Sequence, residues 1–176
     1  MTPETLAKAM NIPLARAQKW APALTDAMRE GEINTRLRQS AFLAQIGHES
    51  GSLVYVREIG GPSYFAKYNG RKDLGNTQPG DGARFCGRGL IQVTGRSNYA
   101  KCSQALFGDD RLLKTPDLLE QPECAAKSAV WFWSTRNLNE LADADRFTDL
   151  TKKINGGTNG IEDRKARYRL ALSVIK

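Results

Sequence analysis

Apolar residues recur at intervals of three and four along most of the chain, and this spacing is typical of amphipathic helices. The first helix is predicted over residues 3–10, with Thr2 as its N-cap. A second pattern runs from 13 to 31, where Pro22 is expected to limit or restart the helix. Further helices are predicted at about 97–106, 115–120, 122–136, 138–142, 148–154 and from 163 to near the end. The chain is therefore predicted to be mainly α-helical.

A third helix, opened by Asn34 or Thr35, carries apolar residues around most of its circumference. Such helices are usually buried, so we expect this one at the centre of the fold. It is predicted to end at Gly51, because glycine readily adopts the left-handed conformation that stops helices. One carboxylate, Glu49, stands just before this stop and shares a helical face with Phe42.

Residues 50–96 differ from the rest because glycines and prolines are frequent there, which indicates turns and irregular chain. Loop-rich stretches of this length are usually functional or mobile. Within it, residues 91–94 form a short alternating run that is expected to be strand-like. A second acid, Glu58, follows Glu49 by nine residues, and two nearby acids are a candidate general acid and base. The structural alternatives are a Glu49 that is exposed at the helix end or paired with an arginine, and a surface pair between Glu58 and Arg57.

The composition narrows the choice of partners. The chain has 176 residues, with 26 Lys+Arg against 19 Asp+Glu, and its net charge of +7 favours polyanions such as an anionic wall polymer. The basic residues are dispersed and no nucleic-acid motif is present, so nucleic acid is not expected as a partner. No apolar run approaches the roughly 20 residues of a membrane span, and stable membrane insertion is not expected. The first residues lack the basic start and apolar stretch of a signal peptide.

Metal and nucleophilic chemistry are disfavoured. Cys86, Cys102 and Cys124 have no metal-ligand spacing and His48 is the single histidine, so zinc is not expected. Free thiols suggest a reducing compartment, although a bridge between Cys102 and Cys124 stays open. No serine or cysteine lies in a nucleophile elbow, so His48 is expected to order a site through hydrogen bonds.

Several motifs in a fixed order together resemble the glycoside hydrolase family 19 domain, in its phage endolysin and bacterial chitinase branch. They are Gly-His-Glu-Ser-Gly at 47–51, Glu58, Tyr64, Gly-Arg-Gly-Leu-Ile-Gln-Val-Thr-Gly at 87–95 with Asn98 and Tyr99, Ala-Val-Trp-Phe-Trp at 129–133, and Ile-Asn-Gly-Gly at 154–157 with Asn159, Gly160 and Arg164. The resemblance covers about residues 35–175. It implies a mainly helical, lysozyme-like fold with a loop-rich substrate groove and little or no β-structure. We therefore expect a single catalytic domain, 1–176, with a helical segment at 1–34 before the core at 35–176.

The resemblance also implies roles for individual residues in an inverting hydrolysis that needs no metal or cofactor. Glu49 matches the general acid, Glu58 the general base, and Thr94 the residue that helps to hold the attacking water. Substrate-binding and neighbouring positions correspond to His48, Tyr64, Gln92, Tyr99, Asn155 and Arg164. Because only residues 65–86 precede the motif at 87–95, we expect no small helical lobe there and a more open groove.

The hypothesis that follows is a monomeric endolysin that cleaves the β-1,4 bond between N-acetylmuramic acid and N-acetylglucosamine in peptidoglycan strands, for host cell lysis. It would be made in the host cytoplasm without a signal peptide and would reach the periplasmic wall through a separate membrane-perforating protein. The alternative enzyme is a chitinase, because both polymers contain N-acetylglucosamine. A non-catalytic glycan binder is a further alternative from a different class.

Overall fold

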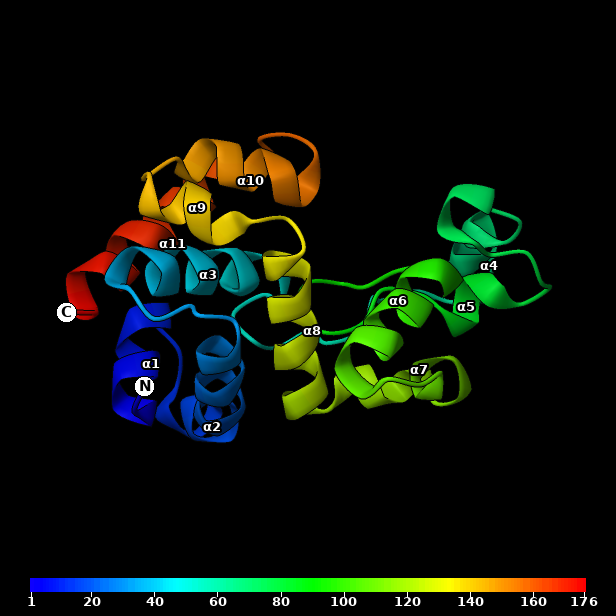
Figure 1. Ribbon diagram of the computed structural model, residues 1–176, viewed down its shortest axis with the longest axis horizontal. Coiled ribbons are helices and arrows are strands. Elements are labelled where there is room, and N and C mark those ends of the chain that lie inside the picture. Colours follow the sequence, from blue (N-terminus) through cyan, green and yellow to red (C-terminus); the bar gives the residue numbers. More distant parts are fainter.

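The computed structural model describes residues 1–176, and helices dominate it (Figure 1). The longer elements are α1 (Pro3–Met10), α2 (Leu14–Glu30), α3 (Arg36–Glu49), α6 (Arg96–Phe107), α8 (Pro122–Ser134), α9 (Leu138–Asp143), α10 (Phe147–Asn155) and α11 (Ile161–Val174). The shorter ones are α4 (Pro62–Phe65), η1 (Ala66–Tyr68), η2 (Lys72–Leu74), α5 (Asp81–Arg84), α7 (Arg111–Lys114) and η3 (Pro116–Glu120). The only β-pairing is two isolated antiparallel bridges, Arg57 with Arg88 and Arg88 with Val93. The prediction of a mainly α fold is confirmed.

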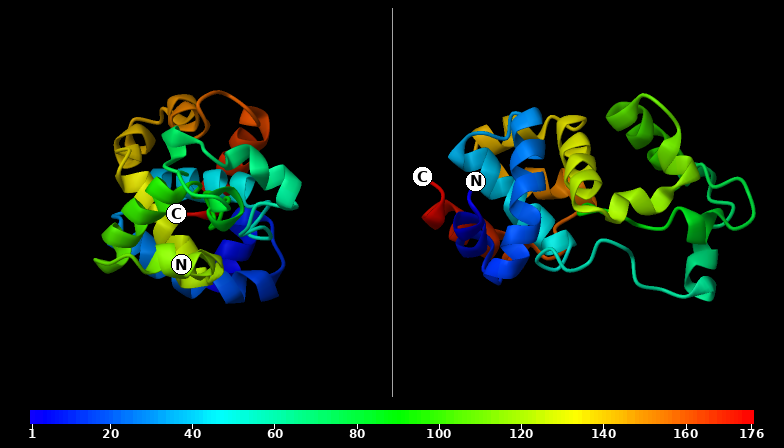
Figure 2. Two further views of the ribbon diagram at one scale, coloured as in Figure 1. Left: turned by 90° about the vertical axis from the view of Figure 1, so that its right-hand side faces the viewer. Right: turned by 90° about the horizontal axis from the view of Figure 1, so that it is seen from below.

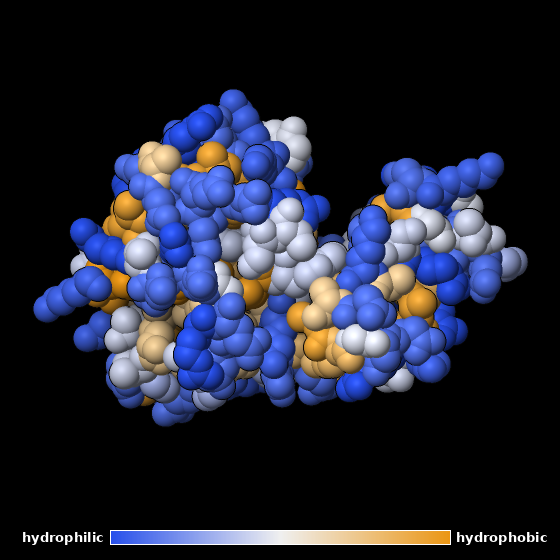
Figure 3. All heavy atoms as spheres, in the orientation of Figure 1, coloured by the Kyte–Doolittle hydropathy of each residue, from blue (hydrophilic) through white to orange (hydrophobic).

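The helices form two lobes of unequal size, with α8 between them (Figures 1 and 2). The larger lobe contains both chain ends and α1, α2, α3, α9, α10 and α11, whereas α4 to α7 make the smaller lobe. Two segments without regular structure, around residues 50–60 and 85–95, run between the lobes. A notch separates the lobes along one edge of the molecular surface (Figure 3).

Helix α3 is the central helix of the larger lobe, as its all-round apolar pattern predicts. Every residue from 40 to 47 is buried, and the helix packs against α11 and α1. The Phe42 ring meets Trp133 of α8 edge to face, with ring centroids 5.3 Å apart. The Thr35 side chain accepts a hydrogen bond from the Arg38 backbone N–H at 3.2 Å and caps the helix. The acid at the end of α3 is thus carried by a helix whose residues 40–47 are all buried.

Two local predictions are wrong. Helix α2 continues through Pro22, because this proline lies on the exposed face, where water can satisfy the carbonyl that loses its helical partner. Residues 91–94 are not strand-like: the chain turns between Arg88 and Val93, and Gln92 has a φ of +58°. The left-handed conformation at Gln92, together with that of Gly89 (φ +79°), closes this turn in place of an extended run.

The smaller lobe is a further correction. Residues 62–84 fold into four short helical elements, so the expectation that this stretch is too short to form a helical lobe is wrong. Polar contacts between side chains and backbone hold these short elements in place. Arg96 forms an ion pair with Asp81 at 2.5 Å, and the Arg96 backbone N–H donates to Asn76 Oδ1 at 2.8 Å. These contacts tie the short helices to α6.

None of the helices is both long and apolar enough to cross a membrane. The three cysteines are free thiols, and burial raises the pKa of Cys102 to about 12. No group of three His, Cys, Asp or Glu side chains is placed to hold a metal ion.

Candidate active site

Glu49 ends α3 and is held by a buried arginine. Arg164 of α11 is 1% exposed, and its Nη2 donates to Glu49 Oε1 at 2.5 Å. The same guanidinium donates to Gln45 Oε1 and, at 3.2 Å, to the Asn159 carbonyl. The second oxygen of Glu49, Oε2, makes no hydrogen bond with the protein, so the carboxyl group is fixed through one oxygen while the other stays available.

The chain turns sharply after Glu49. The Ser50 hydroxyl donates to the Ile46 carbonyl at 2.6 Å, and the next three residues, Gly51, Ser52 and Leu53, all have φ between +56° and +63°. Glycine adopts this conformation easily, and burial of Leu53 stabilises it at the third position. The helix therefore stops at the predicted place.

Glu58 lies in the segment around 50–60 that runs between the lobes. Its backbone N–H donates to the Gly87 carbonyl at 2.8 Å. The hydroxyls of Tyr64 and Tyr68 donate to Glu58 Oε1 at 2.9 and 2.8 Å, and the Gly87 N–H donates to Oε2 at 3.0 Å. Burial and the hydrogen bond to Glu58 both raise the pKa of Tyr68, which keeps its hydroxyl a donor. The alternative of a surface pair with Arg57 is wrong, since Arg57 lies 3.7 Å from Glu120.

Three polar side chains converge at Gly87, where a side chain has no room. A methyl group there would lie 2.6 Å from Gln92 Oε1 and 3.3 Å from both Glu58 Oε2 and Thr94 Oγ1. The Thr94 hydroxyl donates to the Gln92 carbonyl at 2.9 Å, so its lone pairs remain free to accept. The predicted residues Glu58, Gln92 and Thr94 are thus brought together by the turn at 88–93.

Tyr99 is not a surface residue. Its side chain is fully buried; its hydroxyl donates to the Cys86 carbonyl at 2.7 Å and accepts from Arg88 Nη1 at 3.0 Å. The predicted substrate contact is therefore corrected to a supporting one. Arg88 itself is 2% exposed and is paired with Glu120 at 2.8 Å, which fixes the turn that carries Gln92 and Thr94.

The remaining predicted residues lie around the loop that follows α10. His48 Nδ1 is 2.7 Å from Asp163 Oδ2. Burial opposes ionisation of Asp163, but hydrogen bonds from Arg167 and His48 outweigh it and lower the pKa of that carboxyl. Asn155 accepts from the Gly157 N–H at 2.9 Å and donates to the Asn159 carbonyl at 3.1 Å. His48 and Asn155 thus shape the surroundings of Arg164 and Glu49.

A pocket of about 130 Å³ lies between the turn at 88–93 and the end of α8. Its lining comprises Leu74, Ile91, Gln92, Val93, Thr94, Asn98, Trp131, Phe132 and Arg136. Trp133 packs in the core and is 1% exposed, whereas Trp131 and Phe132 are half-buried and face this pocket. Sequence reasoning missed Arg136 here and Tyr68 beside Glu58; the spacing of Tyr68, four residues after Tyr64, was the one signal that could have found it.

Comparisons with known proteins identify the family of the chain. The family model described as chitinase class I matches residues 14–149. A glycosyl hydrolase family 19 domain-containing protein of Haemophilus influenzae is 33% identical over 169 residues, covering 80% of this chain and 81% of that protein. The chain belongs to glycoside hydrolase family 19. It is also 31% identical to an endochitinase of Solanum tuberosum, covering 82% of this chain but 55% of that enzyme. The chain therefore spans about half the length of this plant relative.

The same family fold is evident in solved structures. Chitinase C of Streptomyces griseus superposes on 97% of this chain and 76% of its own, with a TM-score of 0.75 and 23% sequence identity. A bacterial family 19 chitinase superposes with a TM-score of 0.74 over 97% of this chain and 95% of its own. The fold implied by the sequence resemblance is confirmed.

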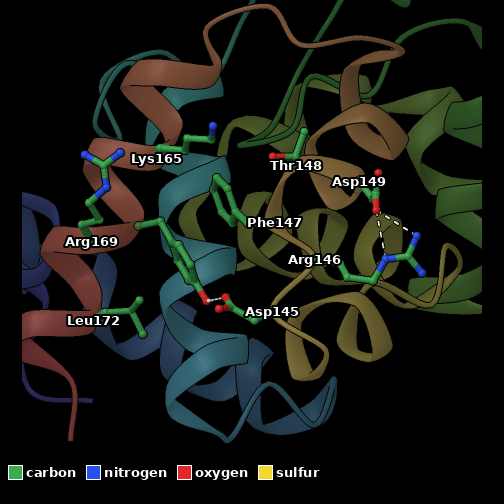
Figure 4. Close-up of a pocket in the computed structure, with 9 residues that line it drawn as sticks. Asp145, Arg146, Phe147, Thr148, Asp149, Lys165, Arg169 and Leu172 are labelled. Carbon is green, nitrogen blue, oxygen red and sulfur yellow. Dashed lines mark hydrogen bonds and ion pairs between the residues drawn. The ribbon is translucent and has the colours of Figure 1, made fainter.

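A second pocket, of about 370 Å³, lies between α10 and α11 and is larger than the pocket beside the turn at 88–93 (Figure 4). Its two acids are already engaged: Asp145 accepts from Tyr168 at 2.8 Å, and Asp149 accepts from Arg146 at 2.9 Å. The Phe147 and Tyr168 rings stack with centroids 4.4 Å apart and fill part of the space. Neither Glu49 nor Glu58 lines this pocket, so the pair of acids lies elsewhere.

We expect Gly87→Ala to lower kcat by about ten- to a hundredfold, because the added methyl group displaces Glu58, Gln92 or Thr94 by a fraction of an ångström or more. Gly61→Ala is the matched control, since no atom lies within 4 Å of a methyl group there. Initial rates on a glycan substrate measure the effect. Equal rates for the two variants would show that the convergence at Gly87 has no part in the reaction.

Proposed function

We propose that this family 19 chain is a peptidoglycan endolysin that hydrolyses the β-1,4 bond between N-acetylmuramic acid and N-acetylglucosamine with inversion. The observation that carries the proposal is the contrast between the two acids. Glu49 is held through Oε1 alone, whereas Glu58 accepts hydrogen bonds from three donors. A carboxyl group with a free oxygen can donate a proton, and a carboxylate surrounded by donors is an acceptor.

In this mechanism Glu49 is the general acid. Its Oε2 gives a proton to the glycosidic oxygen while the bond from that oxygen to the anomeric carbon breaks. Arg164 fixes the direction in which Oε2 points. The sugar that carries the anomeric carbon passes through an oxocarbenium-like state, and the leaving sugar departs as a neutral alcohol.

Glu58 is the general base on the opposite face of the sugar. It removes a proton from a water molecule whose oxygen forms the new bond to the anomeric carbon, so the configuration inverts. Inverting enzymes keep their acids roughly 6.5–9.5 Å apart to leave room for this water. Thr94 Oγ1 and Gln92 Oε1, which converge with Glu58 at Gly87, are placed to accept the water's second proton in a hydrogen bond. Solvent then returns a proton to Glu49 and takes one from Glu58.

Thr94→Val is expected to lower kcat by about tenfold and to leave KM nearly unchanged, because a lost hydrogen bond to the water affects the reaction more than binding. Thr94→Ser restores the hydroxyl and serves as the control. Steady-state kinetics on soluble glycan strands give both constants. A Val variant as active as the Ser variant would remove Thr94 from the mechanism.

The net charge of +7 favours peptidoglycan, because its peptides carry carboxylates whereas chitin is uncharged. A chitinase is the second candidate, favoured by the names of the Solanum tuberosum and Streptomyces griseus relatives. Mass spectrometry of digested peptidoglycan separates the two. We expect fragments that end in reducing N-acetylmuramic acid. Release of N-acetylglucosamine oligomers from chitin without any release from peptidoglycan would contradict the proposal and favour the chitinase.

A further inference from the structure

Arg136 lies just beyond the end of α8 and lines the pocket beside the turn at 88–93. Its positive charge has no acidic partner. It takes part in none of the ion pairs of the structure, although it is half-buried. The only hydrogen bonds of its guanidinium run from Nη1, at 3.4 Å, to the Phe132 carbonyl and the Thr135 hydroxyl. The other side of the guanidinium, formed by Nε and Nη2, has no acceptor in the protein.

The guanidinium is held in place although no acid pairs with it. Its central carbon lies 3.5 Å from the centroid of the Phe132 ring, a stacking contact that limits its movement. Burial alone lowers the pKa of Arg136, which reflects a charge removed from water without compensation. An oriented, partly desolvated guanidinium with a free edge is suited to bind a carboxylate with two parallel hydrogen bonds.

A lysine contacts the backbone of Arg136. Lys153 of α10, an exposed residue, donates from Nζ to the Arg136 carbonyl at 3.3 Å but does not line the pocket. No acid lines the pocket, whose other polar side chains are Gln92, Thr94 and Asn98. Arg136 is therefore the one charged side chain among the residues that line this pocket.

We propose that Arg136 binds a carboxylate of the peptide stem that peptidoglycan carries on its N-acetylmuramic acid residues. This inference rests on the proposed function and adds the part of the substrate that is recognised beyond the sugar chain. Pocket residues Gln92 and Thr94 also surround Gly87 together with Glu58, so a stem bound at Arg136 would hold the strand next to the reacting bond. Chitin has no group that fits this edge.

The test compares two enzymes on two forms of one substrate. Soluble peptidoglycan strands are used as isolated and after their carboxylates have been converted to amides with carbodiimide and ammonia, which removes charge and changes shape little. For the wild-type protein we expect kcat/KM to fall by about ten- to a hundredfold on the amidated strands, the range for a hydrogen-bonded charge pair. For Arg136→Gln we expect nearly the same kcat/KM on both forms, and for Arg136→Lys an intermediate ratio.

Arg169→Gln is the matched control, because it removes the same charge from an exposed arginine on α11 that has no ion pair (Figure 4). Its ratio between the two substrates should equal that of the wild type, which separates a local contact from a general effect of net charge. A wild type that cleaves both forms equally, or an Arg136→Gln variant that keeps the wild-type ratio, would overturn this proposal alone. A wild type that cleaves neither form would overturn the proposed function and this inference with it.

Discussion

Replacing Glu49 by glutamine is expected to lower kcat on peptidoglycan by about 10²- to 10⁴-fold, the usual contribution of a general acid. Glutamine has the same shape and can still accept the hydrogen bond from Arg164, but it has no proton to give to the glycosidic oxygen. Binding should persist, because Oε2 makes no contact that organises the site. The measurements are kcat from the release of reducing ends and affinity for uncleaved strands.

The matched control is Glu140→Gln, the same chemical change at an exposed residue of α9 without an ion pair. Thermal unfolding of each variant separates a chemical effect from a structural one, because Glu49→Gln also leaves Arg164 without its counter-charge. If folded Glu49→Gln released reducing ends at a rate within threefold of Glu140→Gln, Glu49 would not be the acid. If Glu49→Gln lost both its activity and its affinity for uncleaved strands, the role of Glu49 would be to hold the substrate.

Arg164→Met is expected to destabilise the fold by about 3–5 kcal/mol, because removal of one partner leaves the half-buried Glu49 carboxylate and the buried Gln45 side chain without their donor. Arg164 is 1% exposed and links α3, α11 and the loop at Asn159. For a protein of this size the loss corresponds to a decrease in Tm of about 6–20 °C. Calorimetry or circular dichroism during heating measures it.

The control for this prediction is Arg169→Met, five residues further along the same helix and exposed to solvent. Its Tm should stay within about 2 °C of the wild type, as for most surface substitutions. A similar Tm for the two variants would mean that the Arg164 contacts add no net stability, and that the arginine serves only to orient Glu49.

Helix periodicity predicted much of the larger lobe, because it reports which residues are buried. The pattern around α3 predicted a central helix and its end at Gly51, and both are present. It did not predict the turn at 88–93, whose shape depends on a bridge from Arg88 to Arg57, some thirty residues away in the chain. The resemblance assigned Tyr99 to substrate binding, whereas the structure buries it in contact with Cys86 and Arg88.

The site was predicted in part. The order of the motifs predicted Glu49 and Glu58, together with Gln92 and Thr94, as site residues. The roles assigned to these residues stay predictions until the variants are made. Tyr68 was missed because its contact with Glu58 depends on how the short helices of the smaller lobe fold. Arg136 was missed because a cation without a partner is recognisable only once all of its neighbours are known.

The most direct measurement of the central claim is analysis of the products of peptidoglycan digestion, with the bond identified by mass spectrometry and the first-formed anomer by NMR. We predict new reducing ends on N-acetylmuramic acid that appear first as the α-anomer, because attack by water opposite a β-linked leaving group inverts the configuration. First-formed β-anomers would contradict the inverting mechanism. Reducing ends on N-acetylglucosamine, or no cleavage of peptidoglycan at all, would contradict the proposed bond and substrate.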